Sequence, residues 1–466
     1  MFQHADPLRR IAPVPLSQSA EQDGVRRALK DKGRRTALVL AGGGITGAFY
    51  EVGALKALND FMDGTFVTDF DIFVGTSSGA FIAASLANGI SPEEMFRSLH
   101  TEAGFLSQLK RAAFFHPDYE ELWRKVAAFP ATWLSLTRKY LANLEEMTYI
   151  DYLLSFFEVM PAGILSNAGL ETHFRKIFSR PPFVDRFDQI RKELFITAVD
   201  LDAGRRVVFG AKDSPDVRIS TAIRAASALP VIYSPVRIDG IDYVDGAVRR
   251  TLNVDVAIER GADLIFLINP LMPLHNTYRE SCVPLASGSS RHIRTKGLSF
   301  IADQVMRLSF ESRVLYGLNV YRAQHPEVDI LLIQPEPRDF KMFFYRYFQY
   351  SHRIALVEHG YASARSAIMS NYEHWRRAFD QHDIRLSQGL VEYELGVMNR
   401  AGAQLWHADP ATLEGSGAET LDERLGLSSN LAGGAGPRPK SSDAAARLKI
   451  SQISDGERGA GPVDLG

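Results

Sequence analysis

Short apolar runs alternate with stretches of helical spacing at the start of the folded sequence. Thr36 to Ala41 (TALVLA) is an apolar run that stops at glycines, as a buried parallel strand does. Ala48 to Phe61 places apolar residues three and four positions apart, which predicts a helix. Phe70 to Gly75 (FDIFVG) and Ser78 to Asn88 (SGAFIAASLAN) repeat this order. Strand followed by helix, twice within about 55 residues, predicts an α/β fold with a mainly parallel central sheet and helices on both faces.

The later sequence predicts more strands and a helical extension. Further strands are expected at Leu194–Val199, Arg206–Phe209, Leu264–Ile268 and Asp329–Ile333. Between Ser227 and Asp245, two prolines and the alternating segment VRIDGIDYV predict an ordered loop that leads into a hairpin. Helices from about residue 294 to 384 are expected to form a C-terminal addition that covers one side of the sheet.

Composition divides the chain into four parts. Residues 1–35 carry eight Lys/Arg against four Asp/Glu and are expected to form a basic, flexible arm. Residues 36–290 are expected to form the main domain. Residues 291–406 are expected to be the helical extension, with one more strand near 329–333. Residues 407–466 contain no aromatic side chain and are rich in Gly, Ala and Ser, so they are expected to be disordered.

Aromatic residues concentrate in two stretches. Residues 105–157 contain 12 aromatics in helix-like segments, which we treat as an insertion in the main domain, and Lys341 to Tyr350 contains six. These segments either cover the sheet or form an acyl-chain cleft, a lid or an interfacial patch, because aromatic side chains suit apolar–polar boundaries. The sequence leaves these interpretations open.

Composition and charge exclude several classes of protein. Among the 466 residues, 53 Lys/Arg stand against 55 Asp/Glu, so no global cationic field favours nucleic acid. The single cysteine, Cys282, cannot form an intramolecular disulfide and suits a reducing compartment. The first residues lack the apolar core of a signal peptide, and no window approaches the ~20 apolar residues of a spanning helix. We expect a cytoplasmic protein that touches membranes at most peripherally; its oligomeric state is undetermined.

The sharpest motif is Gly75-Thr76-Ser77-Ser78-Gly79, a G-x-S-x-G pattern between a predicted strand and a predicted helix. A nucleophilic serine needs a sharp strand-to-helix turn, and the glycines leave room for that turn. Ser77 is therefore the candidate nucleophile, and Ser78 is expected to cap the following helix.

A glycine-rich loop follows the first predicted strand. Gly42, Gly43 and Gly44 leave several backbone N–H groups unobstructed at a helix N-terminus, where they can bind an oxyanion or a phosphate. With Gly47 the loop also matches G-x-G-x-x-G, but the second predicted strand lacks the acidic residue that a dinucleotide site needs at its end. No Gly-Lys-Ser/Thr follows, which excludes a nucleoside triphosphate loop.

Asp245 is the candidate base. It follows a predicted strand in Tyr243-Val244-Asp245-Gly246-Ala247. A carboxyl group beside an apolar wall has a raised pKa and can then accept the proton of a serine hydroxyl directly. No His, Cys, Asp or Glu spacing indicates a metal site, and we expect no metal or cofactor.

Taken in order, these segments resemble the patatin-like phospholipase family over roughly residues 35–270. The resemblance consists of a strand with GGGITG, a second strand with GTSSG, TAVDLDAG at 197–204, and ALP…SPV leading to VDGA. It implies a three-layer fold and a Ser77–Asp245 dyad without a catalytic histidine. Gly42, Gly43 and Gly44 would form the oxyanion hole, and the enzyme would hydrolyse the acyl esters of phospholipids, lysophospholipids or neutral lipids without a metal. The chain departs from the family at Thr46, where members usually carry Arg or Lys.

Two other interpretations stay open. An α/β-hydrolase carboxylesterase would use Ser77, Asp245 and a later histidine such as His275 or His292, an order that such triads permit. That fold places several strands ahead of its serine, whereas one precedes it here. A lipid-surface binding protein that keeps the fold without turnover is the second alternative, and Thr46 is the feature that favours it.

Overall fold

The computed structural model describes residues 33–393 except 101–105, 107–113, 115, 144–147, 156–159, 213–215, 276–282, 286–287, 291, 337–338, 340–341 and 344–349. Contacts divide the chain into the units Met1–Leu395 and Gly396–Gly466, and every described residue belongs to the first. Cys282, nearly all of the basic arm, the tail from residue 407 and most of the Lys341–Tyr350 segment lie outside the described residues.

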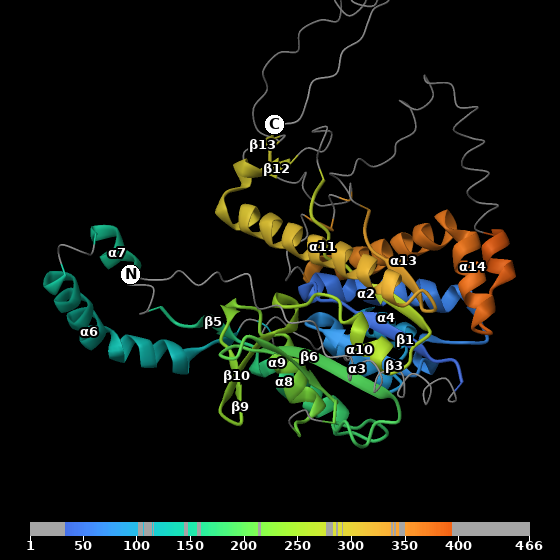
Figure 1. Ribbon diagram of the computed structural model, residues 1–466, viewed down its shortest axis with the longest axis horizontal. Coiled ribbons are helices and arrows are strands. Elements are labelled where there is room, and N and C mark those ends of the chain that lie inside the picture. The colour runs from blue at the N-terminus through green and yellow to red at the C-terminus, as the bar shows by residue number, and fades with distance from the viewer. Residues whose placement is uncertain are drawn as a thin grey trace, which may run out of the picture. The chain divides into compact units, whose positions relative to one another are not determined.

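Eight strands of the described chain form one sheet in the order β14-β11-β1-β3-β6-β10-β9, with β7 paired to β6. The strands from β14 to β6 run parallel, whereas β7, β10 and β9 pair antiparallel. The mainly parallel sheet and the strands expected from the sequence are confirmed (Figure 1). The bounds are β1 Thr36–Leu40, β3 Ile72–Thr76, β6 Glu193–Asp200, β7 Arg205–Phe209, β9 Val236–Ile238, β10 Ile241–Asp245, β11 Leu264–Ile268 and β14 Asp329–Ile333.

The described helices and the strands of the smaller sheets have the following bounds. The helices are α2 Gly44–Phe61, α3 Ser78–Ala87, α4 Pro92–His100, α6 Tyr119–Ala142, α7 Tyr149–Ser155, α8 Ala168–Phe178, α9 Ile219–Ala226, α10 Val254–Glu259, α11 Leu298–Gln324, α13 Arg353–Ser370 and α14 Tyr372–Gln381. Small sheets pair β2 Met62–Asp63 with β15 Arg385–Leu386, β12 Val283–Leu285 with β13 Gly288–Ser290, and β5 Gly163–Ser166 with β4 His116–Pro117 and β8 Val231–Tyr233. The first helix begins four residues earlier than its apolar spacing indicates, because the last glycine of the loop is already helical.

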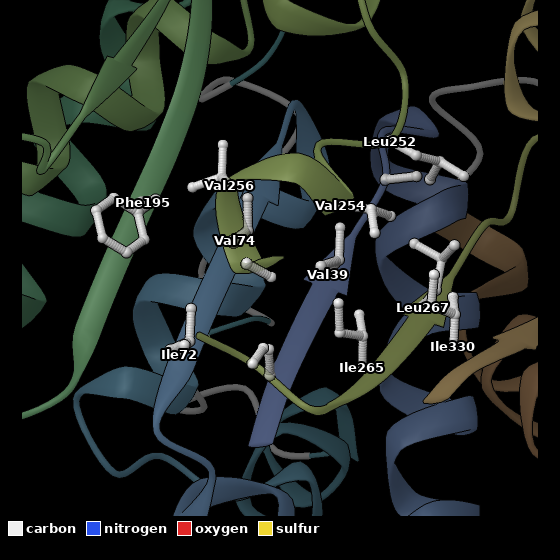
Figure 2. Packing of buried hydrophobic residues seen from close by; sticks show 14 of the residues in the cluster. Val39, Ile72, Val74, Phe195, Leu252, Val254, Val256, Ile265, Leu267 and Ile330 are labelled. Carbon is white, nitrogen blue, oxygen red and sulfur yellow. The ribbon is translucent and has the colours of Figure 1, made fainter. Parts of the chain in front are cut away.

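One face of the sheet packs against α10 and α11. Val39 of β1 and Ile265 of β11 lie in one buried cluster with Val254 of α10. Figure 2 shows these side chains between the strands and α10. Val314 and Leu318 of α11 belong to the same cluster. Because alternate residues of a strand point to opposite faces, α11 therefore covers the face to which Ile265 points.

The helical extension also reaches the opposite face. Phe266, which points away from Ile265, contacts Trp375 and Phe379 of α14 with ring centroids 6.0 and 5.6 Å apart. On α13, a Cβ added to Gly360 would lie 2.0 Å from the Tyr50 carbonyl oxygen of α2, so these two helices touch backbone to backbone (Figure 1). The expectation that the extension covers one side of the sheet is wrong, because α11 returns to one face and α13 and α14 to the other.

The described helices of the aromatic-rich insertion, α6 and α7, leave many large apolar side chains exposed, whereas Phe114 ahead of them is buried. Large apolar side chains of α6 such as Trp123 and Trp133 are exposed, at 70% and 49% of their surface. These two helices contact each other through the rings of Tyr140 and Tyr152, whose centroids lie 4.8 Å apart. No described helix is long and apolar enough to cross a membrane.

Candidate active site

Ser77 occupies a strained turn between β3 and α3. Its φ of 54° and ψ of −124° lie outside the regions that side-chain-bearing residues favour. Such strain persists only where the surrounding structure enforces it, and it concentrates at functional sites. Gly75 and Gly79 permit the turn, since a Cβ on Gly75 would lie 2.5 Å from the Gly79 carbonyl oxygen. The strand–turn–helix expected for the G-x-S-x-G motif is present.

The glycine loop between β1 and α2 lies directly against this serine. A Cβ added to Gly42 would lie 2.6 Å from the Ser77 Cβ and 3.2 Å from its hydroxyl oxygen, so only glycine fits here. Gly44 has a φ of 62° and begins α2. Because the first N–H groups of a helix have no intrahelical acceptor, the amides at this end of α2 are available to a ligand. Their partial positive charge favours an anion beside Ser77.

Two hydrogen bonds hold the loop in place. The Thr46 hydroxyl donates to the Gly43 carbonyl oxygen at 3.2 Å, and the Gly47 N–H donates to the same oxygen at 3.0 Å. Gly47 itself packs closely on Pro270. Tying down the Gly43 carbonyl also fixes the Gly43–Gly44 peptide plane, whose N–H points the opposite way. A buried hydroxyl therefore supports the loop at the position where the related family usually carries a cation.

Asp245 lies at the end of β10, paired with Ala198 of β6, and is 1% exposed. Its Oδ1 accepts the Ala247 N–H at 2.9 Å, whereas the buried Oδ2 has no hydrogen-bond partner among the described residues. Burial raises the pKa of this carboxyl to about 6, and the Ser77 hydroxyl and the Ala247 N–H oppose that rise. The Ser77 hydroxyl therefore lies near enough to lower the pKa of the Asp245 carboxyl, although the two groups form no hydrogen bond of good geometry.

Ser77, Asp245 and the loop glycines line one small cavity of about 50 Å³. Met306 and Phe310 of α11 and Phe114 close it with apolar side chains. Among the described lining residues, Asp245 is the one that carries a charge. A cavity of this size holds water, since one water needs about 10–15 Å³. Ser77 and Asp245, which lie far apart in the sequence, thus line the same apolar cavity. The lining residues are Gly42, Gly43, Gly44, Ile45, Ser77, Ser78, Phe81, Phe114, Asn167, Leu170, Ser227, Leu229, Tyr233, Asp245, Ala247, Leu271, Met306 and Phe310.

A buried polar cluster that the sequence did not indicate lies beneath the turn. The Asn253 side-chain amide donates to the Thr76 hydroxyl at 2.9 Å and to the Thr197 hydroxyl at 3.1 Å. The two threonine hydroxyls are 2.8 Å apart, and a Cβ on Gly246 would lie 2.4 Å from the Thr197 carbonyl oxygen. The cluster therefore connects the residue before Ser77 with the residue after Asp245. No local pattern marks Asn253, because its partners come from two other strands.

Other residues singled out in the sequence do not join the site. The His275 imidazole lies 3.0 Å from the Glu311 carboxylate, and no histidine lines the cavity within the described part of the chain. The expected cap at Ser78 is wrong: Ser77 holds the cap position, and the Ser78 hydroxyl is buried without a hydrogen-bond partner among the described residues. The described residues also contain no group of three His, Cys, Asp or Glu that could hold a metal ion.

Comparison with known sequences finds a similar family. A family model described as "Patatin-like phospholipase" matches residues 38–258, which include the glycine loop, Ser77 and Asp245. Residues 38–258 are therefore similar to the patatin-like phospholipase family. The match agrees with the parallel sheet, the strand–turn–helix around Ser77 and the order of the segments that resemble this family.

Two curated relatives each match about half of the chain. A "Probable lipid hydrolase 463L" of Invertebrate iridescent virus 6 is 26% identical over 238 residues, which are 50% of this chain and 66% of the relative. An "Uncharacterized protein R571" of Acanthamoeba polyphaga mimivirus is 27% identical over 222 residues, 47% of this chain and 60% of the relative. The chain thus spans less than two thirds of the length of the relatives it matches.

Solved structures show looser similarity. VipD from Legionella pneumophila is 14% identical, with 72% of this chain and 67% of that chain covered and a TM-score of 0.33. The ExoU–SpcU complex of Pseudomonas aeruginosa matches at 21% identity, with 61% and 52% covered and a TM-score of 0.25. The similarity to the patatin-like family rests on the family model and not on these superpositions.

Proposed function

We propose that the protein is a lipid acyl hydrolase that cleaves carboxylic esters through an acyl-Ser77 intermediate. One observation carries the proposal. A serine in a strained strand-to-helix turn and a buried carboxyl with a pKa of about 6 line the same apolar cavity, beside the free amides that begin α2. A nucleophile, a base and oxyanion donors are the groups that acyl transfer requires.

The reaction has two halves. The Asp245 carboxylate accepts the Ser77 proton while the hydroxyl oxygen attacks the ester carbonyl, and the amides of the loop at 42–44 bind the oxyanion. When the intermediate collapses, Asp245 returns the proton to the leaving alcohol and the acyl group stays on Ser77. Asp245 then removes a proton from water, the hydroxide attacks the acyl group, and the fatty acid leaves as the proton returns to Ser77.

An apolar substrate fits the lining of the cavity. Its walls carry apolar side chains, and the one charge belongs to the proposed base. At about 50 Å³ the cavity does not hold an acyl chain, so we propose that Met306, Phe310 and Phe114 move when the substrate enters. The family and the name of the viral relative direct the choice of substrate toward lipid esters. The exposed aromatic side chains of α6 are the proposed site of peripheral contact with a lipid surface.

The proposal is tested by ester hydrolysis and covalent labelling. Ser77→Ala is expected to lower turnover of p-nitrophenyl esters by at least about 10⁴-fold and to abolish labelling by a fluorophosphonate probe. Ser85→Ala is the matched control, because the Ser85 hydroxyl bonds only to the Phe81 carbonyl within the same helix. Circular dichroism verifies that both variants fold.

Two outcomes would favour the alternatives. Full loss of activity in His275→Ala would indicate a Ser-His-Asp esterase in place of the dyad. A folded wild-type protein that hydrolyses no ester and whose Ser77 does not react with the probe would indicate a lipid-surface binding protein without turnover.

A further inference from the structure

Helix α11 exposes an apolar stripe along its outer side. Leu298 and Tyr316 are the most exposed members, at 83% and 75% of their surface. At 100° per residue these positions fall within roughly one third of the helix circumference, opposite the buried Val314 and Leu318. The stripe consists of Leu298, Ile301, Val305, Leu308, Leu315 and Tyr316. Apolar side chains aligned over five turns are more than the scattered exposed residues of an ordinary surface.

The same helix forms a wall of the candidate active site. Met306 and Phe310, on its inner side, line the catalytic cavity and pack against Ala247, two residues beyond Asp245. A partner or membrane that binds the apolar stripe therefore lies about 10–12 Å, one helix diameter, from the cavity that contains Ser77.

A second and larger cavity lies against the C-terminal half of α11. It measures about 400 Å³, within the range of ligand pockets, and lies between α11 and the segment that follows Asp245. Arg249, Arg250 and Arg313 line it, and Tyr316 belongs both to its wall and to the apolar stripe. We call this space the arginine cavity.

Among the described residues, two of the three arginines lack an acidic partner. The Arg250 guanidinium pairs with Asp255, which also pairs with Arg206. Arg313 donates to the backbone carbonyls of Val248 at 2.6 Å and Ser309 at 3.1 Å.

Arg249 donates to the carbonyl of Gly204. Within the described part of the chain, neither Arg249 nor Arg313 contacts a carboxylate, and partial burial lowers the pKa of the Arg313 guanidinium. An anion in the cavity would supply the missing countercharge, and a phosphate matches the planar fork of arginine.

We propose that α11 lies on a lipid surface through its apolar stripe and that the arginine cavity holds the phosphate of a lipid headgroup. This arrangement matches the layers of a lipid surface. The aliphatic side chains would contact the acyl chains, the arginines would contact the phosphates, and the tyrosine would lie between the two. A second copy of this chain would bury the arginines beside like charges. The inference rests on the proposed function for its choice of lipid, but its test requires no turnover.

The test uses the full chain with Ser77→Ala, so that vesicles are bound and not consumed. Cosedimentation is measured with phosphatidylcholine vesicles and with vesicles that also contain phosphatidic acid. Ile301→Ser combined with Leu308→Ser is expected to weaken binding to both vesicle types by at least about 10-fold. Leu201→Ser, at a position 48% exposed in the turn after β6, is the matched control and is expected to bind normally.

The arginines are tested by selectivity. Arg249→Gln combined with Arg313→Gln is expected to lower the preference for phosphatidic acid by about 30-fold while binding to phosphatidylcholine persists. Arg249→Gln alone is expected to lower the preference for phosphatidic acid by about 5-fold. This single variant keeps Arg313 and therefore leaves its hydrogen bond to the Val248 carbonyl intact. Arg237→Gln, which removes an exposed charge on the β9–β10 hairpin, is expected to leave the preference unchanged.

Three results would overturn the proposal. The first is equal vesicle binding by the stripe variant, the arginine variants and their controls. The second is a stable dimer of the wild-type chain in solution that the stripe variant dissociates. The third is calorimetric binding of inorganic phosphate that Arg249→Gln abolishes, combined with no binding to either vesicle, because the cavity would then serve a free anion.

Discussion

The two cavities along α11 differ in size and charge. The cavity at Ser77 measures about 50 Å³ and has an apolar lining around a single buried carboxyl. The arginine cavity measures about 400 Å³ and is lined by three guanidinium groups and the Asp255 carboxylate. Both lie against α11: Phe310 lines the first, and Arg313, one turn later, lines the second and lies 4.9 Å from the Phe310 ring centroid. The proposed base and the arginines proposed to bind phosphate thus line different cavities.

Electrostatics gives the reason for this separation. A cation within about 4–6 Å of a carboxylate lowers its pKa by 1–3 units. Asp245 keeps a pKa of about 6 because burial dominates, and no cation lines its cavity among the described residues. Thr46 fits this arrangement, since its hydroxyl supports the glycine loop without adding a charge. The arginines proposed to attract phosphate line the other cavity, and none of them is among the causes of the Asp245 pKa shift.

The largest expected effect comes from removing the carboxyl charge in the small cavity. Asp245→Asn is expected to lower ester turnover by about 10²–10⁴-fold, because the amide cannot accept the Ser77 proton. Asp242→Asn, a neighbouring acid on β10, is the control and is expected to keep near-wild-type turnover. Normal turnover in Asp245→Asn, measured on a soluble ester, would remove Asp245 from the mechanism.

The same substitution is expected to stabilise the fold at neutral pH. A folded-state pKa raised from 3.8 to about 6 favours the protonated carboxyl. Its stabilising contribution is therefore full below about pH 4 and lost as the pH rises through 6. Ionised Asp245 then costs up to about 3 kcal/mol at pH 7, which asparagine avoids. Urea unfolding at pH 7 and at pH 4 measures this, and a variant less stable than wild type at pH 7 would contradict it.

A large effect is also expected from the polar cluster under the turn. Asn253→Leu leaves the buried hydroxyls of Thr76 and Thr197 without their donor. We expect kcat to fall by about 10–100-fold with KM little changed, because the cluster positions the dyad and does not contact the substrate. Asn143→Ala, at the exposed end of α6, is the control. Equal losses of kcat and of stability in Asn253→Leu and Asn253→Asp would indicate a purely structural role.

The pH dependence of ester hydrolysis tests which of the two cavities sets the pKa of the proposed base. Because ionised Asp245 is the proposed base, kcat/KM for a soluble neutral ester is expected to fall about tenfold from pH 7 to pH 5, with a midpoint near 6. Placing a cation in the small cavity with Met306→Lys is expected to lower this midpoint by about 1 unit. Arg249→Gln, which removes a cation from the arginine cavity, is expected to leave it in place. A midpoint that moves with Arg249 instead would show that the cavities are coupled.

The sequence predicted the order of strands and helices around the candidate site well. Apolar runs and helical spacing indicate β1, α2, β3 and α3 in order, because periodicity is a local property of the chain. The glycines of the loop and of G-x-S-x-G also carry local information, since close approach at Gly42 and the turn at Ser77 exclude side chains there. The position of the extension was mispredicted, because the apolar face of a helix does not say which side of a sheet it will cover.

The amino-acid sequence by itself determined the α/β order, the two glycine-rich turns and the candidacy of Ser77 and Asp245. Tertiary structure decided that Asp245 is buried, that α11 closes the cavity, that Asn253 bridges two strands, and that Arg249 and Arg313 face the same space. The physical reason is the range of the interactions. Backbone conformation is set by neighbours a few residues away, whereas burial, and with it the pKa of a carboxyl, depends on residues that folding brings from more than 60 positions away.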